Sequence, residues 1–365
     1  MGKTVIRPAV DDDNDGITEM SKRCLQEGMI TMFVNRTPRF NTLHRLIDSE
    51  AIHYVSCSGN EITGLLGVVH FPYRVLGKEC RAAYMLDFRV LKEHRGGTTA
   101  YRLVRDVVNR LRDSDVDLVI ANFLKDNRNS LIFTTGKAMI PDSLRVGENK
   151  IFNILPLRKM KTDNRFEISH PEISDIPELI ELYRKYSASF KMAPVFDEES
   201  FRTLTGNIKG LSLDNFFIAR ENGKIRAVTA AWDEHYYKSY QVTRVTFSIK
   251  AASLLMRFLS VFMKTPRPIM LNEPLRQLSL VLYAHDECPG ALETLFRHIN
   301  NINRGGKYTI IMLYAQADDP LFRIMKKFTG VTVKSDMYIF ARDTSVYPEL
   351  AANTSPVLFH TGMIL

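Results

Sequence analysis

The hydrophobic and polar positions of the chain fall into two similar series, which begin roughly 160 residues apart. Each series opens with a short apolar strand, an acidic turn and a helix, at 5–20 and again at 166–179. A pair of strands follows in each series. Gly and Asn join the two strands of a pair, because both tolerate the positive φ of a hairpin turn. A repeat of this length predicts a duplicated domain, since the repeats of a solenoid are only about 20 to 50 residues long.

The second part of each series alternates strands with helices. Between the two series, residues 155–164 contain Pro156 and a basic run, which is typical of a linker. The predicted fold is α/β (α+β), with tandem domains at 1–157 and 158–365 that each have a mixed central sheet flanked by helices. The expected strands are 51–58, 61–72, 86–90, 116–123, 215–220, 224–233, 277–285, 308–315 and 337–341, and the later helices are 98–113, 129–135, 290–303 and 320–328.

Composition and charge narrow the classes of partner. The chain is 45% hydrophobic and 25% charged, as in an ordinary folded protein, and 49 Lys+Arg against 41 Asp+Glu give a net charge of +8. This charge suits an anionic ligand, but the basic residues are scattered and accompany no nucleic-acid-binding motif, so we expect no nucleic acid. The apolar window 251–263 is interrupted by Arg257 and is too short to cross a bilayer, which predicts a surface helix.

The cysteines and the first residues favour a cytoplasmic protein. The four cysteines are far apart and include no C-x-x-C pair, so neither a zinc site nor a disulfide framework is expected. No apolar secretion signal opens the sequence. The acidic run 11–16 resembles half a calcium loop, but Lys22 stands where the loop needs Glu, so we interpret the run as a helix start and expect no metal.

The segment from Leu86 to Val104 carries the strongest chemical signal. An apolar strand runs through a glycine-containing basic turn directly into an amphipathic helix. The start of a helix presents unpaired N–H groups and a partial positive charge, and Gly96 and Gly97 let a ligand approach the backbone. The basic or titratable residues around the turn are Lys92, His94, Arg95, Arg102 and Arg105. The segment predicts a phosphate-binding turn, and the alternative is a basic turn without a ligand.

This turn resembles the acyl-CoA motif of the GNAT acetyltransferase superfamily, V-x-P-x-x-R-G-x-G-x-G/A. The matching residues are Val90, Arg95, Gly96 and Ala100. Lys92 replaces the proline, and Thr98 replaces a glycine whose amide faces the pyrophosphate. The order of elements in both halves also resembles this fold. The resemblance implies acetyl-CoA or another acyl-CoA as cosubstrate, bound by Phe88, Arg89, Val90, Arg95, Gly96, Gly97, Thr98, Thr99 and Ala100.

The second half lacks an equivalent turn. Asp286 and Glu287 stand where the pyrophosphate would lie, and like charges there would oppose binding. We therefore expect the first domain to bind acyl-CoA. The second domain is expected to be a degenerate copy that shapes the acceptor site or serves the structure.

Three residues are candidates for catalysis. Asp87, on the motif strand, is the candidate base for the acceptor ammonium, and the alternative is a carboxylate paired with Arg89 or a neighbouring strand. Tyr84 is a further candidate, and it too has a packing alternative. His70 is a third candidate, with packing or a surface position as the alternative. The tyrosine that serves as general acid in many GNAT enzymes is absent from its usual place, which is Lys326 in the second half.

The resemblance predicts an acyltransferase that moves an acetyl or other acyl group directly to a primary amine of a small molecule or peptide. One alternative is a CoA-binding or regulatory protein without turnover. A further alternative is transfer of an aminoacyl or long-chain acyl group, with the apolar segment 251–263 touching a lipid or carrier. The sequence leaves the acceptor, the acyl length and the oligomeric state open.

Overall fold

The computed structural model describes residues 4–95, 98–125, 132–134, 136 and 140–358. Its strands are β1 (Val5–Pro8), β2 (Ile30–Arg36), β3 (Ile52–Ser58), β4 (Glu61–Val75), β5 (Lys78–Val90), β6 (Leu118–Leu124), β7 (Leu144–Ile154), β8 (Glu167–Ser169), β9 (Met192–Pro194), β10 (Phe216–Glu221), β11 (Lys224–Trp232), β12 (Lys238–Val245), β13 (Gln277–His285), β14 (Ile310–Gln316) and β15 (Gly330–Ala341). Its α-helices are α1 (Asn14–Arg23), α2 (Thr42–Ile47), α3 (Thr99–Arg112), α4 (Ile176–Ala188), α5 (Glu198–Asn207), α6 (Phe247–Leu259), α7 (Pro289–Ile302), α8 (Leu321–Met325) and α9 (Tyr347–Ala352).

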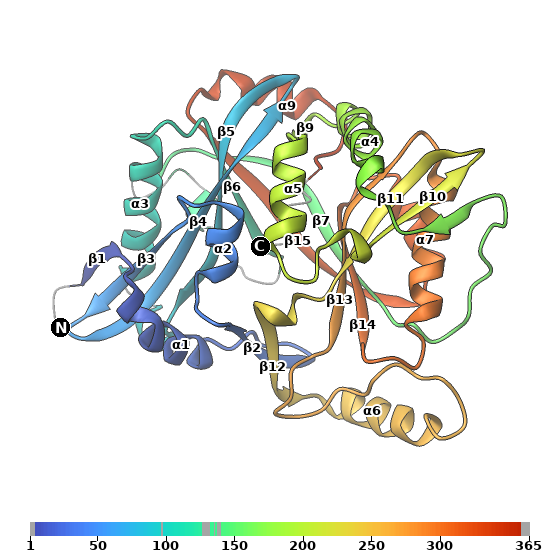
Figure 1. The fold of residues 1–365 in the computed structure, drawn as a ribbon. Coiled ribbons are helices and arrows are strands. Elements are labelled where there is room, and N and C mark those ends of the chain that lie inside the picture. The colour runs from blue at the N-terminus through green and yellow to red at the C-terminus, as the bar shows by residue number, and fades with distance from the viewer. Residues whose placement is uncertain (1–3, 96–97, 126–131, 135, 137–139, 359–365) are drawn as a thin grey trace.

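Thirteen of the described strands form one mixed sheet that runs through both halves (Figure 1). The order is β1-β3-β4-β5-β6-β15-β7-β14-β13-β11-β10-β8, and β9 pairs with β4. The last strand of each half lies against the other half, because β15 pairs with β6 while β7 pairs with β14. The expected fold class is confirmed. The two halves share one sheet, and the largest hydrophobic cluster contains residues of both, while further clusters lie around α3 and α1 of the first half.

The helices cover the sheet with one apolar face each, as their sequence period requires. Helix α3 packs on β3, β4 and β5 of the first half, and α7 packs on β10, β11 and β13 of the second. The buried residues of α3 recur at helical spacing, at Leu103, Val104, Val107, Val108 and Leu111. The predicted helix 98–113 and strand 277–285 therefore correspond closely to α3 and β13.

Other predictions differ from the structure. The last strand, expected at 337–341, begins already at Gly330, because its first residues pair with β7 while their side chains stay exposed. Strand β7 was not located by the sequence pattern. Of the predicted helix 129–135, only 132–134 form a described helical turn, and most of the rest lies outside the described residues.

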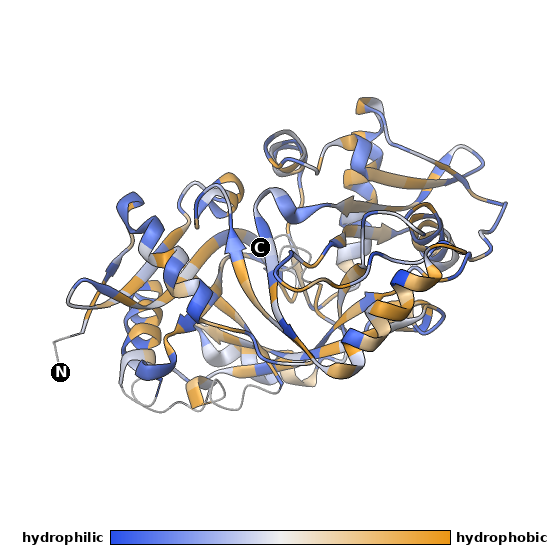
Figure 2. Cartoon of the chain, turned by 90° about the horizontal axis from the view of Figure 1, so that it is seen from below, coloured by the Kyte–Doolittle hydropathy of each residue, from blue (hydrophilic) through white to orange (hydrophobic). Residues whose placement is uncertain are grey.

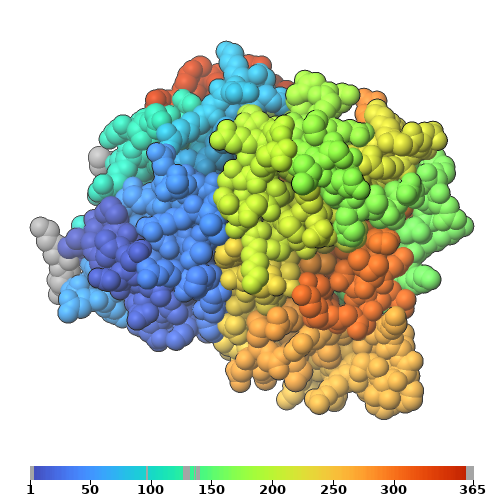
Figure 3. Space-filling model, viewed as in Figure 1, coloured from blue at the N-terminus to red at the C-terminus, as the bar shows by residue number. Residues whose placement is uncertain are grey.

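A small second sheet joins the halves on one side. Strand β2 of the first half pairs with β12 of the second in antiparallel register, from Ile30 opposite Val245 to Arg36 opposite Lys238. Helix α6 follows β12 and lies at the outside of the molecule (Figures 1 and 3). Within the described ranges, no helix combines the length and hydropathy needed to cross a membrane.

Candidate functional site

A bulge in β5 opens the sheet at the predicted motif. Strand β4 pairs Gly67 with Leu86 and Leu65 with Arg89, so Asp87 and Phe88 together face a single residue of β4. Asp87 takes a φ of 53°, a conformation that a bulge can impose on a residue other than glycine. Gly67 makes room for the bulge, because a Cβ there would lie 2.8 Å from the Leu86 side chain.

The sheet also divides at this point. Strand β6 pairs in parallel with β5 only from Ala82 to Met85. Beyond Met85 the register gives Asp87 and Phe88 no paired residue on β6. The main chain of the bulge therefore lies outside the β5–β6 ladder, which is what a ligand that hydrogen-bonds between the two strands would require.

The turn after β5 leads to the start of α3, as predicted. The Nε of Arg95 donates to the carbonyl oxygen of Val90 at 2.8 Å, which ties the turn to the strand. Arg95 and Lys92 are exposed. Thr98 precedes the helix without a side-chain capping bond, so the first amides of α3 stay available to an anion. Gly96 and Gly97, also predicted to bind the cofactor, lie outside the described residues.

The remaining cofactor candidates lie around this strand and helix. The ring of Phe88 makes an edge contact with Phe133, with centroids 5.4 Å apart, and Tyr101 of α3 contacts the same ring. Val90 and Thr99 are buried, and Ala100 of α3 packs against the core of the first half. The Phe88 side chain therefore belongs to the α3 side of the sheet.

Asp87 and Arg89 belong to a buried ion-pair network on the other side of the sheet. Oδ2 of Asp87 lies 2.6 Å from Nε of Arg36 on β2, and its Oδ1 lies 2.8 Å from Arg89. The side chains of Asp87 and Arg36 are only 7% and 8% exposed. Burial by itself would raise the pKa of Asp87, but Arg36 and Arg89 outweigh it and hold that pKa well below its usual range. The carboxylate is therefore ionised and is a weak proton acceptor.

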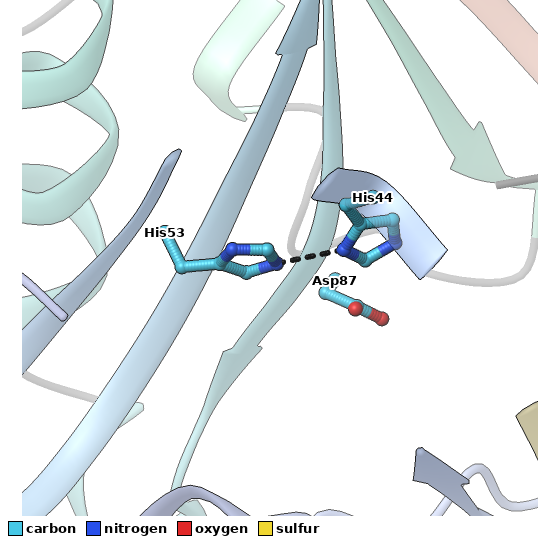
Figure 4. Close-up of side chains that lie close together, drawn as sticks. All are labelled: His44, His53 and Asp87. Atoms are coloured by element: carbon cyan, nitrogen blue, oxygen red, sulfur yellow. Dashed lines mark hydrogen bonds between the residues drawn. The ribbon is translucent and has the colours of Figure 1, made fainter. Parts of the chain in front are cut away.

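A pair of histidines completes this side of the site (Figure 4). His44 Nδ1 of α2 and His53 Nε2 of β3 lie 2.9 Å apart in a hydrogen bond, close to Asp87. Burial lowers the pKa of His44 well below the usual value and that of His53 to about 4, so both rings are neutral near pH 7.

These three side chains are of the types that bind metals, and their ligand atoms lie within 4.8 Å of one another. However, Arg36 and Arg89 already hold the two oxygens of Asp87, so a divalent cation would have to displace a guanidinium. The arrangement favours an ion-pair network over a metal centre. A cavity of about 10 Å³, room for about one water, borders the same carboxylate.

Tyr84 lies on the same face of β5 and joins a second polar chain. Its hydroxyl accepts a hydrogen bond from Asn122 of β6 at 3.3 Å, and Asn149 of β7 donates to Asn122 at 2.8 Å. Burial raises the pKa of Tyr84, so its hydroxyl stays protonated at neutral pH. The charges of Lys238 and Asp87 both act on this hydroxyl.

The second half contributes a buried ion pair to the same centre. Lys238 of β12 lies 2.9 Å from Glu234, and the two side chains are 8% and 0% exposed. Gln277 of β13 also donates to Glu234. Burial would lower the pKa of Lys238, but Glu234 raises it, so the ammonium stays charged. We call this region, with Tyr84, Asp87, Arg36, Asn122, Glu234 and Lys238, the central polar site.

The corresponding part of the second half is closed by aromatic side chains. Strand β13 has the same bulge, with Leu282 at a φ of 51°. Next to it, the hydroxyl of Tyr283 donates to the carbonyl oxygen of Tyr314 on β14 at 3.2 Å. Tyr183 of α4 donates to the carbonyl of Leu282 itself. The gap between β13 and β14 is thereby bridged.

The acidic turn of the second half carries the two carboxylates expected to oppose a pyrophosphate, Asp286 and Glu287. Asp286 was expected to repel a pyrophosphate, but its carboxylate lies 2.7 Å from both Lys224 and Arg226. Hydrogen bonding to Lys224 lowers the pKa of Asp286. The charge of Asp286 is balanced by these two cations, whereas Glu287 is exposed, so repulsion of a pyrophosphate by this turn stays a prediction.

The sequence indicated Tyr84 and Asp87 as candidates and gave pairing with Arg89 as the alternative role of Asp87, a pair that the structure contains, but it missed their other partners. Those partners are Arg36, His44, His53, Asn122, Asn149, Glu234 and Lys238. They come from seven elements or turns spread over the chain, and no local motif joins them. His70, weighed as a further candidate, instead pairs with Asp48 at 3.0 Å.

Comparison with solved structures identifies the architecture. N-myristoyltransferase of Saccharomyces cerevisiae with bound myristoyl-CoA is 13% identical, with a TM-score of 0.63 over 93% of this chain and 83% of the yeast chain. A GCN5-related N-acetyltransferase from Anabaena variabilis ATCC 29413 is 10% identical, with a TM-score of 0.54 over 94% of this chain and 74% of the other. No family model and no curated protein sequence gives a significant match. The expected resemblance to the tandem GNAT fold is confirmed at the level of the fold.

Proposed function

We propose that this protein is an acyltransferase that moves an acyl group from acyl-CoA to a primary amine. The observation that carries the proposal is the bulge of β5, which lies where β5 and β6 part and leads directly to the start of α3. An acyl-CoA needs both features, namely main-chain donors for its thioester arm and a cationic helix start for its pyrophosphate. The similarity to acyltransferase structures supports this assignment.

The first half is the proposed cofactor site. Arg95, Thr98, Thr99 and Ala100, together with Gly96 and Gly97, would hold the pyrophosphate at the start of α3. The main chain of Phe88, Arg89 and Val90 would hold the pantetheine arm and the acyl oxygen. The length of the acyl chain stays open, and acetyl-CoA is the first candidate.

The central polar site is the proposed place of reaction. The amine nitrogen attacks the thioester carbon and loses a proton, the C–S bond breaks, and the thiolate gains a proton. Tyr84 stays protonated and is our candidate donor to the thiolate. Asp87 is proposed to attract the acceptor ammonium and to hold the bulge in shape. Its low pKa makes it a poor base, so we assign removal of the proton to water beside it.

One observation favours a second candidate function. Both oxygens of Asp87 are occupied by guanidinium groups in a buried position. If that network does not open for an acceptor, the protein would bind CoA without turnover.

Two measurements distinguish an acyltransferase from a CoA-binding protein without turnover. The first is calorimetry with CoA, and the second is thiol release from acetyl- and long-chain acyl-CoA in the presence of a panel of amines. We expect CoA binding and amine-dependent thiol release, with Tyr84→Phe lowering kcat by about tenfold or more and leaving CoA affinity unchanged. Binding without release from any pair of substrates would favour the second candidate. Absence of CoA binding would overturn both.

A further inference from the structure

Helix α6 is apolar, yet it lies in solvent. All of it falls within the described part of the chain and none of its residues is buried, whereas α3 and α7 each bury a full face. Figure 2, seen from the side on which α6 lies, shows this helix in front and largely in the colour of hydrophobic residues. Phe247 is 86% exposed and Phe262, just after the helix, is 74% exposed. Contiguous apolar surface of this kind marks an interaction site.

The exposed residues lie on one side of the helix. At 100° per residue, Phe247, Leu254 and Phe258 share a face, and Ile249 and Met256 on the opposite face are partly covered. The two rings of Phe258 and Phe262 are in contact, with centroids 5.6 Å apart. We call the exposed side chains Phe247, Leu254, Leu255, Phe258, Val261 and Phe262 the α6 surface.

Basic residues run along one edge of the α6 surface. Lys250 and Arg257 are seven residues apart and thus on the same side of the helix, and Lys264 follows after seven more. All three are exposed. From Lys238 to Asn272 the sequence has six Lys or Arg residues and no Asp or Glu. Helix α6 and the segment from its end to Asn272 therefore carry basic and no acidic side chains, and Glu273, the next residue, pairs with Arg267.

The combination of an apolar face with a basic edge indicates which partner could bind the α6 surface. A second copy of the chain docking through the same face with the two helices antiparallel would bring the basic edges together, which like charges oppose. A bilayer with anionic headgroups complements both the apolar face and the basic edge, because it accepts apolar side chains and attracts Lys and Arg at its surface. We propose that the α6 surface docks on anionic membranes, with the helix, about 20 Å long, lying in the plane of the headgroups.

Flotation of the full chain with vesicles tests this proposal. The vesicles contain either phosphatidylcholine alone or equal parts of phosphatidylcholine and phosphatidylglycerol. We expect the protein to float with the anionic vesicles only, and to dissociate as salt is raised. The pair Phe258→Glu and Phe262→Glu should abolish flotation, and the pair Lys250→Glu and Arg257→Glu should weaken it by at least about tenfold.

Two exposed apolar residues elsewhere provide the matched control. Ile173 and Val331 are 69% and 59% exposed, and the pair Ile173→Glu and Val331→Glu should leave flotation unchanged. Circular dichroism and CoA binding report whether each variant is folded. Equal binding to both kinds of vesicle, or to neither, would overturn the proposal. It would also be overturned if Phe258→Glu and Phe262→Glu changed the oligomeric state, measured by light scattering, but not flotation.

Discussion

The bulges of β5 and β13 have the same main-chain geometry, but the side chains at the two bulges differ in polarity. Asp87 and Leu282 each lie two residues beyond the last parallel pair of their strand, and their φ angles are 53° and 51°. In the first half the bulge residue is a carboxylate held by two arginines, and in the second it is a fully buried leucine beside a tyrosine that bridges the strand gap. The duplicated geometry is thus kept in both halves, while polar chemistry at the bulge is kept in one.

A second contrast concerns two buried aspartates. Asp87 is paired, and its pKa lies well below the usual range. Asp319, in the second half, is 4% exposed, and one of its oxygens has no hydrogen-bond partner among the described residues. Burial raises its pKa to about 6. Burial therefore destabilises the charge of Asp319, whereas the partners of Asp87 compensate for it.

The largest expected effect on stability comes from replacing the bulge residue of the first half, Asp87, with leucine, the bulge residue of the second half. Asp87→Leu should lower the free energy of unfolding by about 3 to 5 kcal/mol, because Arg36 and Arg89 would be left buried without a counter-charge. Urea unfolding can be followed by the fluorescence of Trp232, the single tryptophan. Adding Arg36→Leu and Arg89→Leu should recover part of the loss. If Asp87→Leu alone were as stable as the wild type, the ion pairs at the first bulge would not contribute to stability, and the contrast with the second bulge would not hold.

Charge reversal at or beside the two helix-start turns tests which half binds the cofactor. Arg95→Glu should weaken CoA binding by about a hundredfold, since it places a carboxylate beside the proposed pyrophosphate. Lys224→Glu makes the same change of charge at the first residue of β11, whose side chain pairs with Asp286 of the second half's turn, and should alter affinity by less than about twofold. The measurement is calorimetry with CoA. The reverse ranking of the two variants would move the cofactor to the second half.

The two aspartates should give opposite dependences of stability on pH. The pKa of Asp319 is raised in the folded state, so its contribution is favourable below about pH 4 and is lost as the pH rises through 6. Asp319→Asn should therefore stabilise the protein by about 2 to 3 kcal/mol at pH 7.5 and by little near pH 4. Asp87→Asn should destabilise at pH 7.5, with the difference shrinking in acid. Melting temperatures of the variants at pH 4 and pH 7.5 test this prediction. An equal change in melting temperature for Asp319→Asn at the two pH values would contradict it.

The smallest effect is expected from opening the bridge in the second half. Tyr283→Phe removes the hydroxyl that donates to Tyr314 and should cost about 1 kcal/mol of stability. It should leave CoA stoichiometry at one per chain, because the rings still fill the gap. A second CoA site in calorimetry would mean that this single hydrogen bond separates the two halves.

The element pattern and the turn could be predicted from local sequence, but the site could not. Helical spacing of apolar residues located α3, and the glycines and basic residues after Val90 located the turn, since both signals are short-range. Strand β7 and the pairing of β2 with β12 gave no such signal. Arg36 and Lys238 meet Asp87 and Tyr84 only because that pairing brings distant segments together.

The sequence by itself determined the duplicated order of elements, the character of the Arg95 turn and the apolar, basic composition of residues 247–264. Only the tertiary structure decided that the last strands are exchanged, that Asp87 is ion-paired twice, and that α6 is left uncovered. The physical reason is the distance along the sequence over which each interaction acts. Periodicity and turn chemistry act over a few residues, whereas pairing, burial and the resulting pKa shifts depend on which distant segments meet.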